Sequence, residues 1–278
     1  MYFKKYKPCP LFSKYIEWYF TIDMSLPDFY MEHLVIPDGT FGLIFLERDD
    51  AISRSLCAQS SRLPMKKTSV FGQKTSAVNY SLNSIGSKVF GIKIKPAGMH
   101  LFVKHVHSIK NRFIDIDTLN NKALLQLEDR VLASPTIKEK IKSIEDYILQ
   151  HLKKSPCTTD LQYLENMVDL ILMHKGNIRF NSLINYFNIN YKKAERLFLK
   201  YIGLTPKTYI RIIRFNTCVN HYNTSGSLTQ MAFENGFFDQ SHFIKEFKQF
   251  TSLTPRQFLK KEYSLSQSES LNIINNRL

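Results

Sequence analysis

The chain has 278 residues, of which 44% are apolar and 22% charged, a composition that excludes wholesale disorder and is enough for about two domains with separate cores. Its charge is unusual: 38 basic against 24 acidic residues give +14, and residues 173–263 alone hold 14 Lys and Arg against 5 Asp and Glu, a net charge of +9. Such a concentrated excess points to a polyanionic partner, with nucleic acid ahead of an anionic membrane surface.

The cysteines and the N-terminus indicate the compartment. The four cysteines are far apart and match no paired-ligand spacing, which predicts reduced thiols and neither a disulfide scaffold nor a zinc site. Residues 1–20 carry charges and prolines where a signal peptide needs an apolar stretch. No run of about 18 uninterrupted apolar residues occurs. We therefore expect a cytoplasmic protein without a membrane partner.

Short strands and turns are predicted along the first hundred residues. Residues 33–47 are two apolar runs joined by a Pro-Asp-Gly turn at 37–39, in which Pro presets φ and Gly accepts a positive φ. Residues 69–82 are a further strand-like stretch. Residues 88–100 alternate Ile92 and Ile94 with lysines, which predicts a strand with one buried face. Several short strands punctuated in this way favour a sandwich or open barrel.

After about residue 100 the pattern becomes helical. Residues 134–154 place isoleucines 137, 141, 144 and 148 on one helical stripe. Residues 155–160 are short, polar and contain Pro, which predicts a linker. The sequence thus predicts an α+β chain: a β-sandwich domain with flanking helices over 1–154, an all-α domain over 161–263 and a flexible tail over 264–278.

The helical domain contains an internal repeat with an offset of 49 residues. Residues 190–210 align with 239–259. The alignment superposes Phe198 on Phe247 and a shared Leu-Thr-Pro. This agreement indicates a duplicated unit, and each copy is typical of a helix, a tight turn, a second helix and a third helix.

Capping signals delimit the helices of the second copy. Ser227 and Gln230 form a capping box that opens one helix, and Gly236 ends it. Asp239 caps the next helix, whose buried stripe consists of Phe243, Phe247 and Phe250. The last helix opens with the Thr-Pro-Arg-Gln of residues 254–257.

The first copy has the same order of elements as the second. Residues 181–187 form its first helix, 188–190 the turn, and 191–202 the second helix, which Gly203 ends. A long helix that joins the two copies runs from residue 205 to about residue 222.

The neighbours Asp239, Ser241 and His242 invite a hydrolase interpretation. On the first turn of a helix their side chains diverge by about 100° each, whereas a catalytic triad needs a convergent chain of hydrogen bonds. No G-x-S-x-G elbow precedes Ser241. Capping and a solvated surface explain Asp239, but they do not explain why both copies carry a polar and basic face. We therefore predict no enzymatic activity.

The second helix of each copy also has positions that are not expected to be buried. Their side chains include hydrogen-bond donors suited to base edges and phosphates, and an α-helix is narrow enough to enter a major groove. In the first unit they are Tyr191, Lys192, Lys193, Glu195, Arg196 and Lys200. In the second unit they are Gln240, Ser241, His242, Ile244, Lys245 and Lys248. Phosphate contacts from the long helix are assigned to Lys207 and Arg211. Two tandem helix-turn-helix units that bind double-stranded DNA account for this pattern.

A resemblance to a known family supports this interpretation. Residues from about 160 to 263 resemble the DNA-binding domain of AraC/XylS-type bacterial transcription regulators, in which a long helix joins two helix-turn-helix subdomains. The pattern IAxxxGFxDxSxFxxxFK is present as Met231-Ala232, Gly236-Phe237, Asp239-Gln240-Ser241-His242-Phe243 and Phe247-Lys248, followed by Thr254-Pro255. The chain departs from the family at Ala194, where a larger apolar residue is usual, and at Ser252, where Gly is common.

The resemblance implies both a function and roles for residues. It implies a sequence-specific transcription regulator with a small-molecule effector, RNA polymerase and a second copy of the chain as further partners. The second copy would bind through the helices around 134–154. Base-facing positions carried over from the family are Lys192, Glu195, Arg196, Gln240, Ser241, Ile244 and Lys245. The sequence leaves open the operator, the effector and the direction of regulation.

The N-terminal half resembles the cupin-like sensor region of the same family, through residues 33–45 and 89–103. A cupin suggests a metal, but His105-x-His107 has neither a Glu at the needed distance nor a third His placed after it, so no metal or cofactor is predicted. Aromatic residues 15 and 18–20 are expected in the core ahead of lining a ligand cavity. The alternatives are a cupin-type metal-dependent enzyme with a DNA-targeting C-terminal domain and a pure interaction protein.

Overall fold

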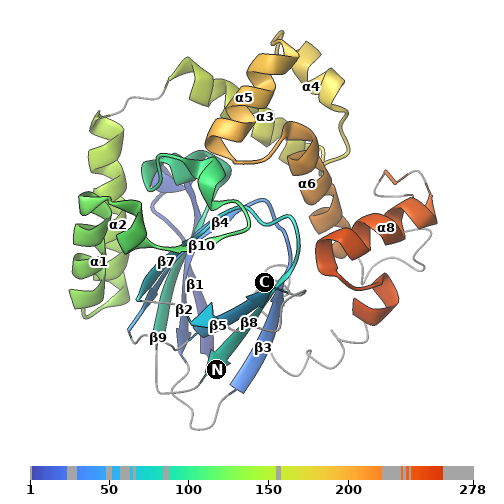
Figure 1. Cartoon of the computed structure of the whole chain (residues 1–278). Helices are drawn as coiled ribbons and strands as arrows, with labels where there is room; N and C mark the ends of the chain where they lie inside the picture. Colours follow the sequence, from blue (N-terminus) through green and yellow to red (C-terminus); the bar gives the residue numbers. More distant parts are fainter. Residues whose placement is uncertain are drawn as a thin grey trace.

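The N-terminal half consists of two antiparallel sheets (Figure 1). The computed structural model describes residues 2–23, 30–47, 52–56, 63–64, 67–83, 88–154, 158–220, 233, 236–237 and 239–258. The six-stranded sheet has the order β1 (Tyr2–Tyr6), β2 (Ile16–Asp23), β9 (Lys88–Ile94), β4 (Phe41–Leu46), β7 (Thr68–Phe71) and β10 (Phe113–Asp115). The four-stranded sheet has the order β3 (Tyr30–Val35), β8 (Val78–Asn83), β5 (Ile52–Leu56) and β6 (Leu63–Pro64).

The two sheets share an apolar cluster, which confirms the predicted sandwich. Val78 of β8 packs in this cluster with Ile44 and Leu46 of β4. The opposite face of the six-stranded sheet is covered by helices α1 (Lys122–Ala133) and α2 (Ile137–Lys154). Ile144 and Ile148, on the predicted isoleucine stripe of α2, are fully buried in that second cluster.

The turn at 37–39 carries the chain from one sheet to the other. It joins β3 to β4, yet β3 pairs with β8, and β4 lies between β9 and β7. Gly39 has a φ of +78°, as predicted for the Pro-Asp-Gly turn. The stretch 69–82, expected as one strand, contains β7 and β8, which belong to different sheets. Short 3₁₀ helices complete the domain: η1 (Pro10–Phe12), η2 (Pro96–Leu101), η3 (Val106–Ile109) and η4 (Ile116–Leu119).

The C-terminal half is helical. Its described helices are α3 (Thr159–Met173), α4 (Phe180–Tyr186), α5 (Tyr191–Tyr201), α6 (Pro206–Asn220) and α8 (Gln240–Thr251). Phenylalanines of α8 and Phe215 of α6 pack ring against ring in one core, as the predicted stripe requires. Most of the predicted helix over 227–235, with its Ser227–Gln230 box, lies outside the described residues, although Phe233 is described and helical. The end of the long helix, the tail over 264–278 and residues 155–157 of the predicted linker also lie outside them. The linker prediction is wrong for residues 159 and 160, which belong to α3, with Thr158 as its N-cap.

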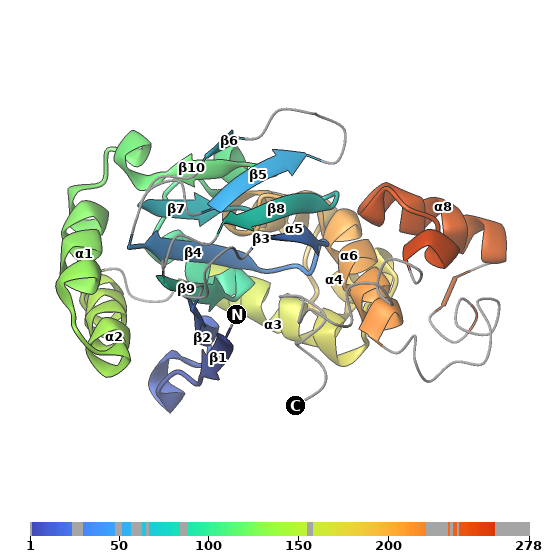
Figure 2. The same ribbon diagram turned by 90° about the horizontal axis from the view of Figure 1, so that it is seen from below.

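Helix α6 packs on the turn at 37–39 and so joins the two halves. A Cβ added to Gly39 would lie 2.7 Å from Ile213 Cδ1 and 3.1 Å from Tyr209 Cε2. The Asn216 side-chain amide donates to the carbonyl of Pro37 at 3.4 Å. Figures 1 and 2 place α6 and α8 on the opposite side of the sheets from α1 and α2.

A buried group of charges lies beneath this contact. Lys93 Nζ is 2.9 Å from Asp38 Oδ2 and 3.7 Å from Glu17 Oε2. The expectation that Lys93 faces solvent is therefore wrong: its side chain is only 14% exposed, because the face of β9 opposite the helices is also covered. Burial alone would raise the pKa of Asp38, but the charges of Lys93 and Lys74 and two hydrogen bonds hold it well below the ordinary range.

We expect Asp38→Ala to lower the free energy of unfolding at neutral pH by about 3–5 kcal/mol, since it leaves Lys93 buried without its closest carboxylate. Because the pKa of Asp38 is depressed in the folded state, its contribution is present above the ordinary aspartate pKa of about 3.9 and declines as the pH falls below it. Urea unfolding of wild type and variant should therefore converge toward acid pH.

The matched control is Asp146→Ala, which removes an exposed aspartate of α2 and should change stability by less than about 0.5 kcal/mol. Equal unfolding midpoints for Asp38→Ala and Asp146→Ala would contradict the role assigned to the pair.

Candidate nucleic-acid interface

Helix α5 presents a basic face beside an apolar one. Asn190 caps the helix, accepting from the backbone N–H of Lys193 at 2.8 Å, and Gly203 ends it with a φ of +76°. Its buried side consists of Ala194, Leu197, Phe198 and Tyr201. A depression of about 540 Å³ lies at its N-terminal end, lined by Asn190, Tyr191, Lys192, Lys193 and Arg196. The structure thus brings most of the first-unit candidates together on one concave surface.

Not every first-unit candidate is free to bind. Lys193 Nζ lies 3.5 Å from Asp160 of α3 and 4.8 Å from the ring centre of Tyr163. Lys207 lies over the ring of Tyr191 at 5.9 Å. Lys192, Arg196 and Lys200 are exposed, and Glu195 is half-buried.

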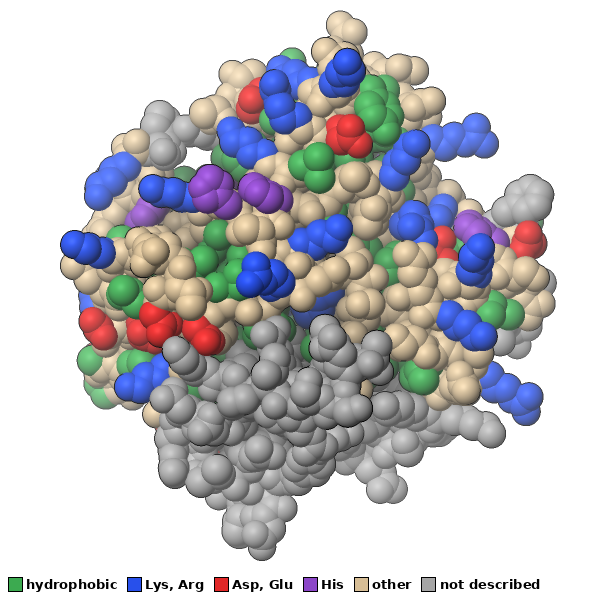
Figure 3. All heavy atoms as spheres, viewed as in Figure 1, with side chains coloured by type: hydrophobic (Ala, Val, Ile, Leu, Met, Phe, Trp, Pro, Cys, Tyr) green, Lys and Arg blue, Asp and Glu red, His purple; other side chains and the backbone are tan. Residues whose placement is uncertain are grey.

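Helix α8 carries the second-unit candidates on its exposed side. Asp239 caps the helix as predicted, accepting from the backbone N–H of His242 at 2.7 Å. Exposed positions that follow the cap are Gln240, Ser241, His242, Lys245 and Lys248, with Ile244 half-buried. Ser252 ends the helix with a φ of 62°, the left-handed conformation for which Gly is common in the resembling family. Lys and Arg side chains gather over both α5 and α8 on the face shown in Figure 3.

A buried carboxylate, Glu246, joins α8 to α6. Its side chain is 1% exposed, and its Oε1 accepts from Arg211 Nε at 3.2 Å. Arg214 Nη2 and His242 Nε2 each lie 3.5 Å from Glu246 Oε2. These distances are short enough for ion pairs, but the atoms do not have hydrogen-bond geometry. Arg211 also donates to Gln249 at 2.6 Å. Arg211, predicted to contact phosphate, therefore already has two protein partners.

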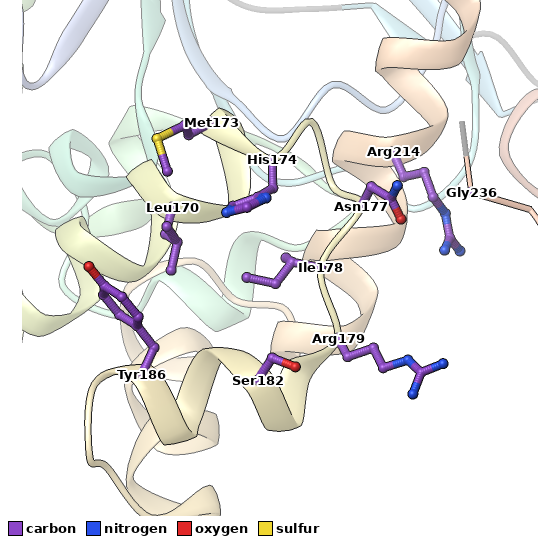
Figure 4. A pocket seen from close by; sticks show the side chains of 10 residues that line it. All are labelled: Leu170, Met173, His174, Asn177, Ile178, Arg179, Ser182, Tyr186, Arg214 and Gly236. Atoms are coloured by element: carbon purple, nitrogen blue, oxygen red, sulfur yellow. The ribbon is translucent and has the colours of Figure 1, made fainter. Parts of the chain in front are cut away.

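A cleft of about 710 Å³ separates the first unit from α6 and the turn before α8 (Figure 4). The side chains of Leu170, Ile178, Met173 and Tyr186 form its apolar lining. Arg179 and Arg214 extend their guanidinium groups toward one side of it, and Asn177 lies beside Arg214. Arg214 Nε is buried without a hydrogen-bond partner, and its guanidinium lies 4.8 Å from the ring centre of Phe237.

One exposed residue of these surfaces, Leu199, escaped the sequence-based prediction. Leu199 is 40% exposed and lies one helical turn beyond Arg196 on the same side of α5. That spacing would have found it, had apolar residues not been assigned to the core. The pairings of Lys193 with Asp160 and of Arg211 with Glu246 had no sequence signal, because the partners are on different helices.

Of the aromatic residues expected in the core, Tyr15, Tyr19 and Phe20 are at most 7% exposed, whereas Trp18 is half-buried. His105 and His107 are both exposed. In the ranges described, no three His, Cys, Asp or Glu side chains are placed to hold a metal ion, as the metal-enzyme alternative requires. Across those same ranges, no helix has the length and hydropathy needed to span a bilayer.

Two protein families match separate parts of the chain. Residues 183–261 match a helix-turn-helix domain family, and residues 4–115 match a family described as a domain of unknown function. The first match contains α5, α6 and α8 and their exposed basic faces. It agrees with the prediction of a helix-turn-helix domain in the helical half.

Among known proteins, the HTH-type transcriptional regulator GbdR of Pseudomonas aeruginosa is 28% identical over 123 residues, which are 43% of this chain and 33% of GbdR. The chain thus spans about a third of the length of the curated relative it matches. Crystal structures of ToxT from Vibrio cholerae match with TM-scores of 0.43 and 0.44 at 15% and 14% identity, over 83% and 84% of this chain and 97% of ToxT. That likeness is too low to carry a functional argument.

We expect Glu246→Ala to destabilise the second unit by about 3–5 kcal/mol, because it leaves Arg211 and Arg214 without their shared carboxylate. Hydrogen exchange resolved by peptide is the appropriate measurement, since the two halves need not unfold together. Amides of α8 should exchange faster in the variant, whereas those of β9 should not change.

Gln249→Ala is the matched control on the same helix, as it removes only a neutral partner of Arg211. The interpretation fails if the two variants exchange alike in α8.

Proposed function

We propose that this chain, whose residues 183–261 match a helix-turn-helix domain family, is a sequence-specific DNA-binding transcription regulator of the AraC type. The observation that carries the proposal is the pair of capped helices α5 and α8, each with an apolar side in the core and exposed polar and basic residues at its N-terminal end. Both are connected to α6, which holds them in one helical domain. A net charge of +9 over residues 173–263 supplies attraction to a polyanion.

In the proposed complex, α5 and α8 enter successive major-groove segments on one face of the DNA, about 34 Å or roughly 10 base pairs apart. Arg196 is suited to bidentate contact with guanine, and Glu195 to accepting from cytosine N4. Lys245, with Gln240 and Ser241, would contact bases in the second segment. Lys200, Lys207 and Lys248 would contact phosphates. Lys193 and Arg211 have protein partners and are the weakest candidates.

The further partners are proposed on the resemblance alone. They are a small-molecule effector that binds the N-terminal half, RNA polymerase, and a second copy of the chain that binds through the helices around 134–154. An effector alters DNA occupancy only if it binds two states of the protein with different affinity. The proposed site of action is the cytoplasm.

Fluorescence anisotropy tests the function directly. The full chain is titrated onto the DNA upstream of its own gene and onto a scrambled duplex of the same composition, across a salt series. Tighter binding to the upstream DNA, with an affinity that falls steeply with salt, is the expected result. Equal and weak binding to both duplexes would count against a site-specific regulator of that DNA.

The reading helix is tested by Arg196→Ala. Because a bidentate contact to guanine is worth about 1–3 kcal/mol, the variant should lose about 5- to 150-fold in affinity for the preferred DNA and much less for the scramble. Arg196 is exposed, so the fold should be unaffected.

Lys248→Ala is the companion variant. It removes an exposed cation and should weaken binding to both duplexes by a similar factor. A uniform loss for Arg196→Ala as well would show that Arg196 contacts only phosphate.

A further inference from the structure

The N-terminal half carries a basic segment that the proposed function does not use. Residues 104–112, K-H-V-H-S-I-K-N-R, contain Lys104, Lys110, Arg112, His105 and His107 and no acidic residue. All five of these side chains are exposed. Within the described parts of the chain, no carboxylate forms an ion pair with any of them, in contrast to Lys193, Arg211 and Arg214.

The segment is held rigidly by the sheet domain. Val106 and Ile109 of η3 are 1% and 0% exposed and anchor it in the core. The carbonyl of Arg112 accepts from Gly72 N at 3.2 Å, and the backbone N–H of Asn111 donates to the carbonyl of Gln73 at 2.8 Å. The cations therefore project from a fixed backbone, which lowers the entropy lost when they bind a ligand.

The same segment packs against the C-terminal end of α5. A Cβ added to Gly203, directly after α5, would lie 3.1 Å from the carbonyl oxygen of Val106 and 3.2 Å from His107 Cα. At the last turn of α5, the ring of Tyr201, the residue after Lys200, packs edge to face against His100 of η2 at 5.7 Å between ring centres. The cations of α5 and of residues 104–112 thus lie on elements that contact each other.

The segment faces the same way as both reading helices. In Figure 3, His side chains and neighbouring Lys side chains over η3 lie on the face that also shows the basic side chains of α5 and α8. In helix-turn-helix proteins, the phosphates that border the groove pass beside the ends of the reading helix, and basic residues there supply affinity without reading sequence.

We propose that the basic segment 104–112 of the N-terminal domain binds DNA phosphates beside the groove that α5 reads, so that the DNA-contacting surface extends across both domains. This inference rests on the proposed DNA-binding function and deepens it. The segment adds affinity and salt dependence and leaves base recognition to α5 and α8. Consequently, any event that separates the N-terminal domain from α5 weakens DNA binding without changing the preferred sequence.

The test compares two triple variants of the full chain. The patch variant is Lys104→Gln, Lys110→Gln and Arg112→Gln. The control variant, Lys4→Gln, Lys67→Gln and Lys88→Gln, removes the same three charges from exposed positions on β1, directly before β7 and at the start of β9, none of which the proposed function uses. Both variants have the same net charge, so a difference between them reports position and not overall electrostatics.

Affinity for the upstream and scrambled duplexes is measured by anisotropy at several salt concentrations. Each phosphate contact contributes about 0.9 to the slope of log K against log salt, so the patch variant should lose about 2 to 3 from the slope on both duplexes. Its preference for the upstream DNA over the scramble should stay that of the wild type. The control variant should keep the wild-type slope.

Three results overturn the inference: a patch variant with the wild-type slope, a control variant with the same loss of slope, or a patch variant that loses only its preference for the upstream DNA. The first two leave the proposed function intact whenever the wild type still prefers the upstream DNA. Failure of the wild type to bind either duplex would instead overturn the proposed function, and the inference with it.

Discussion

The ion pair between Asp38 and Lys93 fixes the point at which the two halves of the molecule meet. Burying two charges costs several kcal/mol, and the cost is offset only by close pairing and further hydrogen bonds. Here the carboxylate also accepts from the backbone and hydroxyl of Thr40, and Gln73 donates to the carbonyl of Gly39. The turn held in this way joins a strand of one sheet to a strand of the other, and α6 packs on it. The sandwich and the placement of the helical domain therefore depend on the same few side chains.

Glu246 holds α8 to α6 within the helical domain, as Asp38 holds the turn to the sheet. Buried carboxylates such as these leave two kinds of basic residue: those paired with a carboxylate and those exposed without one. A domain with a large positive charge repels itself, which opposes compact folding. Buried or half-buried carboxylates relieve that repulsion by pairing with Arg211, Arg214 and Lys193. Net charge thus overstates how many cations are free for a polyanion. The exposed ones that form no ion pair within the described residues, such as Arg196 and Lys245, are those that we propose to contact DNA.

Local features of the fold could be predicted from the sequence, whereas long-range ones could not. The caps at Asn190 and Asp239 and the left-handed Gly236 follow from backbone chemistry that involves only a few consecutive residues. Strand partners are different: nothing in residues 33–47 reveals that β3 and β4 enter separate sheets. The burial of Lys93 is also a long-range feature. Its alternation with isoleucines is the pattern expected of a residue that faces solvent. It is buried only because the second face of β9 is covered as well.

Contact of α5 and α6 with the sheet domain sets how DNA affinity could be regulated. A ligand shifts an equilibrium only by its difference in affinity for the two states. If docked and separated arrangements differ in the phosphate contacts available to residues 104–112, then DNA favours the docked arrangement by the free energy of those contacts. By linkage, a ligand that favours docking strengthens DNA binding by the same factor by which DNA strengthens binding of that ligand. Because the side chains of α5 and α8 that we propose to contact bases lie outside the domain contact, such regulation would change occupancy and leave sequence preference unchanged.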